Sequence, residues 1–169
     1  NSLEEIYTKL DYDKYTLEKY KYLEAYILEL FNNHSMITDS SDSNVYHWNG
    51  IYYEEVEKNY ELTVKYYSMA IEIGNANAMN RLGYYYMTIE KNYELGIKYY
   101  LMAVETGNSN AMFNLGYHYM DIEKNYELGI KYLLMAIEAG NVDAMYNLGY
   151  CYMVIKKNYE LGIKYLQMA

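Results

Sequence analysis

Three residues whose side chains can do chemistry recur at one step along the chain. Tyr85, His118 and Cys151 are 33 residues apart, so a repeating fold would place them at equivalent points of neighbouring units. Imidazole and thiolate are zinc ligands, and Asp121 follows His118 by about one helical turn. Zinc ordinarily takes four ligands, however, and the sequence offers no second pair. We therefore expect no metal site and interpret the three as unrelated surface side chains.

Acidic residues are the other group that could act in catalysis. Asp121 with Glu123, or Glu54 with Glu55 and Glu57, could serve as general acids. Solvated charge at a helix end is the more common role of such residues. The sequence also contains no nucleophile elbow, phosphate loop or zinc-ligand spacing. It thus predicts a protein that is not an enzyme and has no cofactor.

The 33-residue step belongs to a repeat that runs through most of the chain. Leu-Gly-x-x-Tyr and Asn-Tyr-Glu-Leu motifs alternate along it, starting at Leu82, Asn92, Leu115, Asn125, Leu148 and Asn158. A weaker copy has Gly50 and Asn59 at the corresponding places. A fixed period of this length is typical of solenoids, in which each unit buries its apolar face against the next. We predict four repeats over residues 44–169, the last one cut short at Ala169.

Each repeat is predicted to form two antiparallel helices. The first begins at a side chain able to cap a helix, and this offset holds Asn77, Asn110 and Asp143. Its apolar face follows helical spacing through Met79, Leu82, Gly83 and Tyr86. The second helix begins after Asn92 and ends at Gly107, a residue type that adopts positive φ readily. The predicted fold class is all-α, a right-handed α-solenoid of antiparallel helix pairs.

Glycine inside the helices indicates that they approach closely. Gly83 and Gly96 lie in helix interiors, where glycine costs about 0.5 to 1 kcal/mol relative to alanine. A backbone without a Cβ lets a large partner such as Tyr99 or Tyr100 pack against it. We interpret both glycines as structural.

Residues 1–43 do not follow the repeat and are predicted to form a helical N-terminal cap and a loop. The segment Ser2–Glu5 fits a capping box. An amphipathic helix is expected to end near Asn32, followed by a loop rich in Ser and Asp.

Charge and composition exclude several classes of partner. The formal net charge is -9, the wrong sign for binding nucleic acid. Residues 1–74 hold 6 lysines against 14 acids, and the rest of the chain is close to neutral. One cysteine rules out an internal disulfide, and no apolar run reaches the roughly 20 residues of a membrane span. We therefore predict a cytoplasmic protein that binds neither nucleic acid nor membrane.

The motif spacing resembles a known helical repeat. The chain reads Gly-x-x-x-Ala-x-x-x-Leu-Gly-x-x-Tyr from Gly107 and x-x-Tyr-Leu-x-Met-Ala-x-x-x-Gly from Gly129. This resembles the Sel-one-like repeat, a relative of the tetratricopeptide repeat, over residues 44–169. The tetratricopeptide period is almost as close, but that pattern has a proline between repeats and this chain has none. The Lys-Asn-Tyr-Glu-Leu run also resembles repeat proteins of giant DNA viruses, which implies the host cytoplasm or the virion.

The chain departs from the Sel-one-like pattern in two places. Its loop within the repeat is about three residues shorter and lacks the Gly-x-Gly-Val of the family, as the 33-residue step requires. The usual alanine of the second helix is replaced by Thr63, Gly96, Gly129 or Gly162. The resemblance implies adaptor or scaffold work in protein complexes, without chemistry of its own.

The side of each first helix opposite the apolar face is expected to line a concave groove. Aromatic side chains left on a solvent-facing stripe are typical of interface anchors. The predicted partner-binding residues are Trp48, Ile51, Glu55, Asn80, Arg81, Tyr84, Thr88, Phe113, Asn114, Tyr117, Asp121, Tyr146, Asn147 and Tyr150. His47 and Val154 share the same stripe. An alternative explanation is that tyrosine is simply common in this chain.

These observations predict a noncatalytic scaffold that binds a peptide or protein segment in its groove. Acidic residues near Glu54 and Glu55 would favour a basic segment at the N-terminal end. The alternative is a structural protein that assembles end to end through its last helix.

Overall fold

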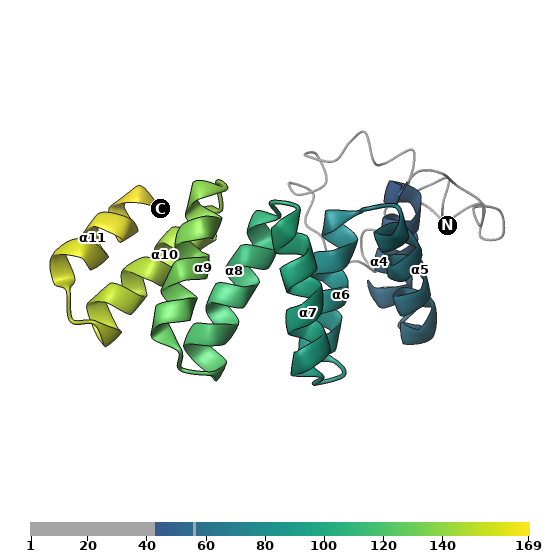
Figure 1. Cartoon of the computed structure of the whole chain (residues 1–169), viewed down its shortest axis with the longest axis horizontal. Coiled ribbons are helices and arrows are strands. Elements are labelled where there is room, and N and C mark those ends of the chain that lie inside the picture. Colours follow the sequence, from purple (N-terminus) through teal and green to yellow (C-terminus); the bar gives the residue numbers. More distant parts are fainter. Residues whose placement is uncertain (1–42, 56) are drawn as a thin grey trace. The chain divides into compact units, whose positions relative to one another are not determined.

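The structure is a computed structural model that describes residues 43–55 and 57–169. Short turns join its helices, which Figure 1 shows in sequence order. The helices are α4 (Ser43–Glu55), α5 (Tyr60–Glu72), α6 (Ala76–Thr88), α7 (Tyr93–Glu105), α8 (Ser109–Tyr117), η1 (His118–Ile122), α9 (Tyr126–Glu138), α10 (Val142–Tyr150), η2 (Cys151–Ile155) and α11 (Tyr159–Met168).

These elements confirm the all-α repeat solenoid of paired helices, and no strand occurs among the described residues. The chain forms two compact units, residues 1–78 and 79–169, and α6 spans the boundary between them. The predicted N-terminal cap, with Ser2–Glu5 and Asn32, lies outside the described residues. None of the described helices is long and apolar enough to cross a membrane.

The second helix of each repeat starts where the sequence predicts. The side chain of Asn92 caps α7 by accepting a hydrogen bond from Leu95 N at 3.1 Å. The equivalent cap bonds of α5, α9 and α11 are made by Asn59, Asn125 and Asn158. Gly107 follows the end of α7 with φ +83°, which confirms its role at the C-terminus of that helix.

The first helix starts two residues earlier than predicted. Asn75, Asn108 and Asn141 are the capping residues, and Asn141 Oδ1 accepts from Ala144 N at 3.0 Å. Asn77, Asn110 and Asp143 lie instead in the first turn of α6, α8 and α10. The buried Asn141 also donates from Nδ2 to Asn110 Oδ1 at 3.0 Å. One asparagine thus caps its own helix and joins it to the first helix of the preceding repeat.

Glycines bring the two helices of a repeat into contact, as the sequence predicts. A Cβ on Gly83 would lie 2.7 Å from the Tyr100 ring and 3.2 Å from the Gly96 carbonyl oxygen. In the next repeat, Gly116 faces Leu133 in the same way. Met87 lies against Gly96 on the other side of the helix contact, which the sequence did not indicate.

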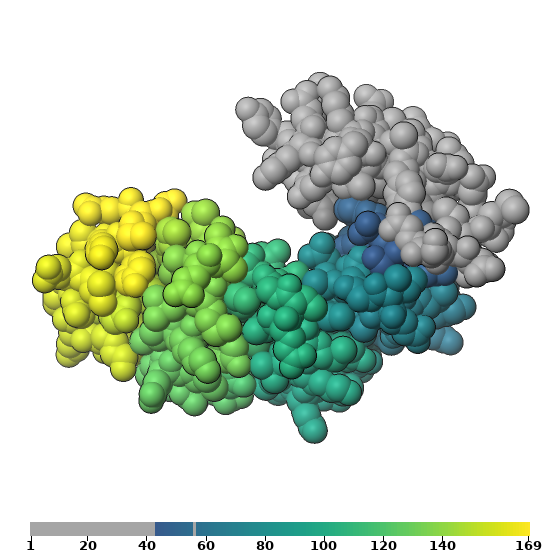
Figure 2. Space-filling view, turned by 45° about the horizontal axis from the view of Figure 1, so that its top comes forward, coloured from purple at the N-terminus to yellow at the C-terminus, as the bar shows by residue number. Residues whose placement is uncertain are grey.

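The core of the third and fourth repeats is continuous. Met112, Leu133, Ala136, Ala144 and Leu148 form one buried cluster that draws on α8, α9 and α10. Figure 2 shows α8 to α11, coloured green to yellow, as one closely packed body.

The connection between the two helices of a repeat is tight and strained. In the third and fourth repeats the first helix ends in a π-helical turn, in which Glu123 N donates to His118 O at 3.2 Å. Four lysines then adopt left-handed φ between 53° and 55°, at Lys58, Lys91, Lys124 and Lys157. This conformation disfavours any residue with a Cβ.

Candidate functional site

Three tyrosines at one repeat offset form an exposed stripe on the second unit. Tyr84 on α6, Tyr117 on α8 and Tyr150 on α10 have 47, 50 and 53% of their surface exposed. Tyr146, one turn before Tyr150, is also exposed, and Phe113 occupies the same offset on α8, where it is half-buried. We call these five residues the tyrosine stripe.

Side-chain amides lie beside the rings, and one pair of them joins two successive first helices. Asn114 Nδ2 donates to Asn80 Oδ1 at 3.0 Å, which links α8 to α6. Asn147 instead donates to the carbonyl oxygen of Asp143 at 3.1 Å within α10. These amides are half-buried, so each is accessible next to the stripe.

The charged and hydroxyl groups along the stripe are few. Thr88 Oγ1 donates to the Tyr84 carbonyl oxygen at 2.8 Å, and half-buried Arg81 lies one turn before Tyr84. Tyr117 donates its hydroxyl to Asp121 Oδ2 at 3.2 Å. The negative charge of Asp121, more than burial, raises the pKa of the Tyr117 phenol, so Tyr117 stays a neutral donor at physiological pH.

In the first unit the expected continuation of the stripe is wrong at two positions. Ile51, the equivalent of Tyr84, is only 8% exposed and belongs to the core, and His47 is buried too. Trp48 is half-buried, with its ring 5.6 Å from that of His47. Glu55 keeps partial exposure and lies 3.6 Å from Lys58 Nζ.

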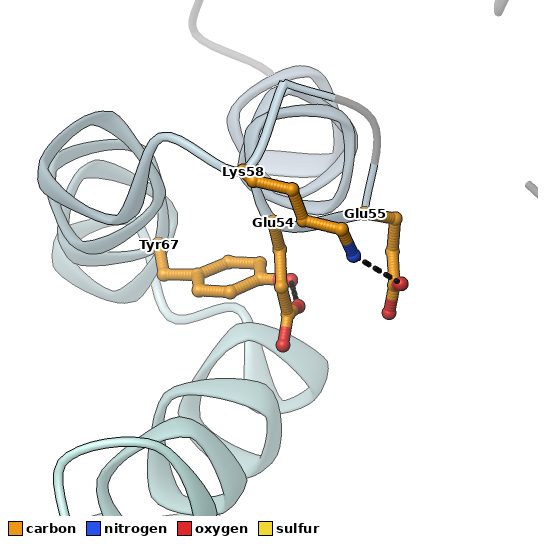
Figure 3. Close-up of polar contacts among 4 residues, drawn as sticks. All are labelled: Glu54, Glu55, Lys58 and Tyr67. Carbon is orange, nitrogen blue, oxygen red and sulfur yellow. Dashed lines mark hydrogen bonds and ion pairs between the residues drawn. The ribbon is translucent and has the colours of Figure 1, made fainter. Parts of the chain in front are cut away.

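Glu54 is not the solvated residue that the sequence predicts. It is buried, and the Tyr67 hydroxyl donates to its Oε2 at 2.5 Å (Figure 3). Glu54 occupies the place that methionine takes in the other repeats, and Thr63 replaces the facing glycine. That paired exchange is the signal in the sequence that could have revealed this contact.

The series Tyr85, His118 and Cys151 is buried, so its interpretation as surface side chains is wrong. Tyr85 donates its hydroxyl to Glu90 at 2.5 Å, and His118 Nε2 lies 3.1 Å from Glu123 Oε1. The first helix contacts neighbours on two sides, which widens its buried face beyond the predicted one. A signal in the sequence could have indicated this wider buried face. Alanine recurs four positions before Leu82 and seven before Tyr85, and likewise in the next two repeats, at Ala78, Ala111 and Ala144.

The buried series shows no metal centre. No group of three His, Cys, Asp or Glu side chains that could hold a metal ion occurs in the part of the chain that the structure describes. Burial raises the pKa of the Cys151 thiol, and Lys156 lowers it by less. Cys151 is therefore a protonated core side chain, and not an activated nucleophile.

Stacked tyrosines are a further feature that the sequence did not indicate. Tyr86 and Tyr99 stack between the two helices of the second repeat, with ring centroids 5.6 Å apart and planes 5° from parallel. The same contact recurs as Tyr53–Tyr66, Tyr119–Tyr132 and Tyr152–Tyr165. Much of the tyrosine excess is therefore structural.

Comparison with known families shows to which family the chain belongs. The description "Sel1 repeat" matches residues 43–75, 76–108, 109–141 and 142–169 in succession, which together make up well over half of the chain. The chain is a Sel1 repeat protein. The predicted resemblance is thereby confirmed, and Sel1 repeat proteins are generally noncatalytic scaffolds for protein–protein interaction.

Solved Sel1-type structures share the fold. A protective antigen of uropathogenic Escherichia coli with an SLR fold aligns at a TM-score of 0.64 and 23% identity, over 75% of this chain and 30% of that one. A Sel1 repeat protein from Oxalobacter formigenes aligns at 0.62 and 23%, over 76% of this chain and 56% of that one.

A more distant likeness is to an immunity protein from Pseudomonas aeruginosa, with a TM-score of 0.52, 19% identity, and coverage of 82% and 65% of the two chains. The Sel1 repeat chain spans less than two thirds of each of these proteins. No curated protein matches the sequence.

Proposed function

We propose that this Sel1 repeat protein is a noncatalytic adaptor that binds a peptide or protein segment along the tyrosine stripe. One observation carries the proposal: tyrosine occupies the same exposed offset on three successive first helices, where it contributes little to the core. Large rings held on rigid helices are typical anchors of interfaces. Tyr84, Tyr117 and Tyr150 are the proposed anchors, supported by the amides of Asn80, Asn114 and Asn147.

The experiment compares the wild-type chain with a variant in which Tyr84, Tyr117 and Tyr150 are all alanine. A display library of random peptides selected on the wild type is expected to yield binders that the variant no longer retains. Helicity and melting temperature should change little. If the variant unfolds, or binds the selected peptides equally well, the proposed surface is wrong.

The structure gives limited support for the predicted basic segment near the N-terminal end. Glu54 is engaged with Tyr67, and Glu55 lies beside Lys58. A basic partner is therefore no part of the proposal. The cytoplasmic location and the viral origin stay predictions from composition and motif.

A structural, self-assembling protein is the second candidate function. One observation favours it: α11 exposes Ile163, Leu166 and Met168, and exposed apolar faces favour association. Light scattering over a concentration series tests it. Growth of the mean mass with concentration, abolished by Met168→Lys at an exposed position, would support assembly, and a constant monomer mass would exclude it.

A further inference from the structure

The stacked tyrosine pairs are a feature that the proposed function does not use. Each pair joins the first helix of a repeat, or the π turn that ends it, to the second helix of the same repeat. The ring centroids lie 5.2 to 5.8 Å apart, and the ring planes are within 11° of parallel. The four pairs are Tyr53–Tyr66, Tyr86–Tyr99, Tyr119–Tyr132 and Tyr152–Tyr165. The contact is therefore a property of the repeat and not of a single position.

Packing alone does not explain the hydroxyl groups of these pairs. Phenylalanine rings stack in the same offset manner, yet both members of every pair are tyrosine. Burial, and then the neighbouring Tyr99 phenol, raise the pKa of Tyr86 above its ordinary value. The same two causes, burial and the stacked partner Tyr132, raise the pKa of Tyr119. Tyr86 and Tyr119 are therefore protonated at physiological pH, and each must release a proton when it is oxidised.

The stacked rings are accessible to a small reagent, unlike the tyrosines of the core. All members of the four pairs are half-buried, whereas Tyr67 and Tyr100 are 0 and 2% exposed. Tyr85 meets Tyr86 edge-on, with ring planes 71° apart, but Tyr85 is 3% exposed and its hydroxyl is bonded to Glu90. A small oxidant therefore reaches both rings of a stack and is excluded from the core rings beside them.

We propose that the stacked pairs are sites of oxidative cross-linking, at which each repeat acquires a dityrosine bond between its two helices. Each phenol gives one electron to a one-electron oxidant and its hydroxyl proton to water. The two phenoxyl radicals then form a carbon–carbon bond between the ring positions next to their oxygens, and each of these carbons passes its hydrogen to the adjacent oxygen. The pair thus loses two electrons and two protons in all, and two equivalents of the oxidant are reduced.

Stacking favours a bond within one chain over a bond between two chains. The rings of a pair are held against each other, so their coupling is intramolecular and needs only a small movement of the side chains. Tyr117 and the other exposed tyrosines react mainly when two chains collide, at a rate that falls as the chain is diluted. The bond formed in a stack closes the short segment between the two helices, which restricts the unfolded chain as a disulfide does.

The test oxidises the folded chain at low concentration with photogenerated ruthenium(III) tris(bipyridine), and the monomer is then isolated by gel filtration. We expect dityrosine fluorescence in the monomer fraction and the loss of two hydrogen atoms in mass for each bond formed. Mass spectrometry of the digested monomer should find Tyr86 joined to Tyr99 and Tyr119 joined to Tyr132. The same oxidation in urea should lose this pairing, because the unfolded chain has no stacks.

One triple variant removes a hydroxyl from three of the four stacks but keeps the rings. It replaces Tyr86, Tyr119 and Tyr152 by phenylalanine, which stacks in the same way, so the helices should be preserved by circular dichroism. Only the pair of the first repeat can then react. The dityrosine signal of the monomer should therefore fall to about a quarter of the wild-type value when distant pairs react independently.

The matched control removes the same number of hydroxyls from the tyrosine stripe. It replaces Tyr84, Tyr117 and Tyr150 by phenylalanine and should leave the monomer signal unchanged, because these residues belong to no stacked pair. A monomer without dityrosine, equal losses in the two triple variants, or bonds that map outside the stacks would each overturn the inference.

Discussion

Gly116 is the residue at which the packing of a helix pair can be tested most directly. A Cβ there would lie 2.8 Å from Leu133 Cγ and 3.1 Å from Leu133 N, and the backbone atom can move only if α8 and α9 separate. We expect Gly116→Ala to lower the free energy of unfolding by about 1 to 3 kcal/mol, although alanine is the better helix former. Thermal and urea unfolding measure this change.

Tyr117→Ala is the matched control for Gly116→Ala, because it changes the next residue of the same helix. Tyr117 is half exposed, so its loss should alter stability by no more than about 0.5 kcal/mol. Equal losses from the two substitutions would show that the faces of α8 are assigned wrongly.

Lys91 offers the opposite experiment, a substitution that should stabilise the protein. Its φ of 55° is unfavourable for a residue with a Cβ by about 1 to 2 kcal/mol. Glycine removes that strain but gains freedom in the unfolded chain. We expect Lys91→Gly to raise stability by a few tenths to about 1 kcal/mol, measured by urea unfolding. Lys91→Val, which is β-branched, should lower it, and the reverse order would contradict the strain argument.

At the scale of elements, Asn141 joins the start of α10 to the preceding repeat. Its Oδ1 caps α10 and its Nδ2 donates to Asn110 on α8. Asn141→Ala removes both bonds from a buried site, so we expect a loss of about 2 kcal/mol or more. Asn110→Ala removes only the bond between repeats and should cost about 1 kcal/mol.

A double-mutant cycle on Asn141 and Asn110, followed by urea unfolding, isolates the contact between repeats. A coupling energy of at least about 0.5 kcal/mol is expected for bonded neighbours. Asn158→Ala serves as the control, because Asn158 is exposed and caps only its own helix. Additive losses at Asn141 and Asn110 would mean that the bond between repeats contributes nothing to stability.

At the scale of the whole molecule, the repeats should not unfold together. Leu133 is fully buried in the third repeat, while its equivalent Leu166 is 36% exposed in the fourth. The stability of a repeat array is roughly a sum of repeat and neighbour terms, so the fourth repeat is expected to open first. Cys151 reports on that repeat, and Trp48, the only tryptophan, reports on the first.

Alkylation of Cys151 should therefore begin at a lower urea concentration than the change in Trp48 fluorescence. Without urea the reaction should be very slow, because Cys151 is fully buried and burial raises its thiol pKa, which leaves less thiolate at a given pH. Mass spectrometry of the labelled fraction across a urea series measures this. Coincident transitions would indicate that the chain unfolds as one cooperative body.

The sequence by itself determined the features that depend on neighbours along the chain. Asn92 caps a helix through an amide three residues away, and Gly107 ends it through its own backbone freedom. The glycines within the helices indicated the close contact, because their cost needs a compensating neighbour. Helix pairing and the repeat therefore followed from local chemistry and spacing.

The tertiary structure was needed to decide how far the buried face of each first helix extends and which asparagine caps the helix. Asn108 and Asn110 can both cap a helix, and the buried Asn141 shows that the earlier position also reaches across to the preceding repeat. Ile51 and Tyr84 share one offset, yet only Tyr84 is exposed. Burial is set by residues distant in sequence that happen to pack there, and a helical period cannot show where those neighbours lie.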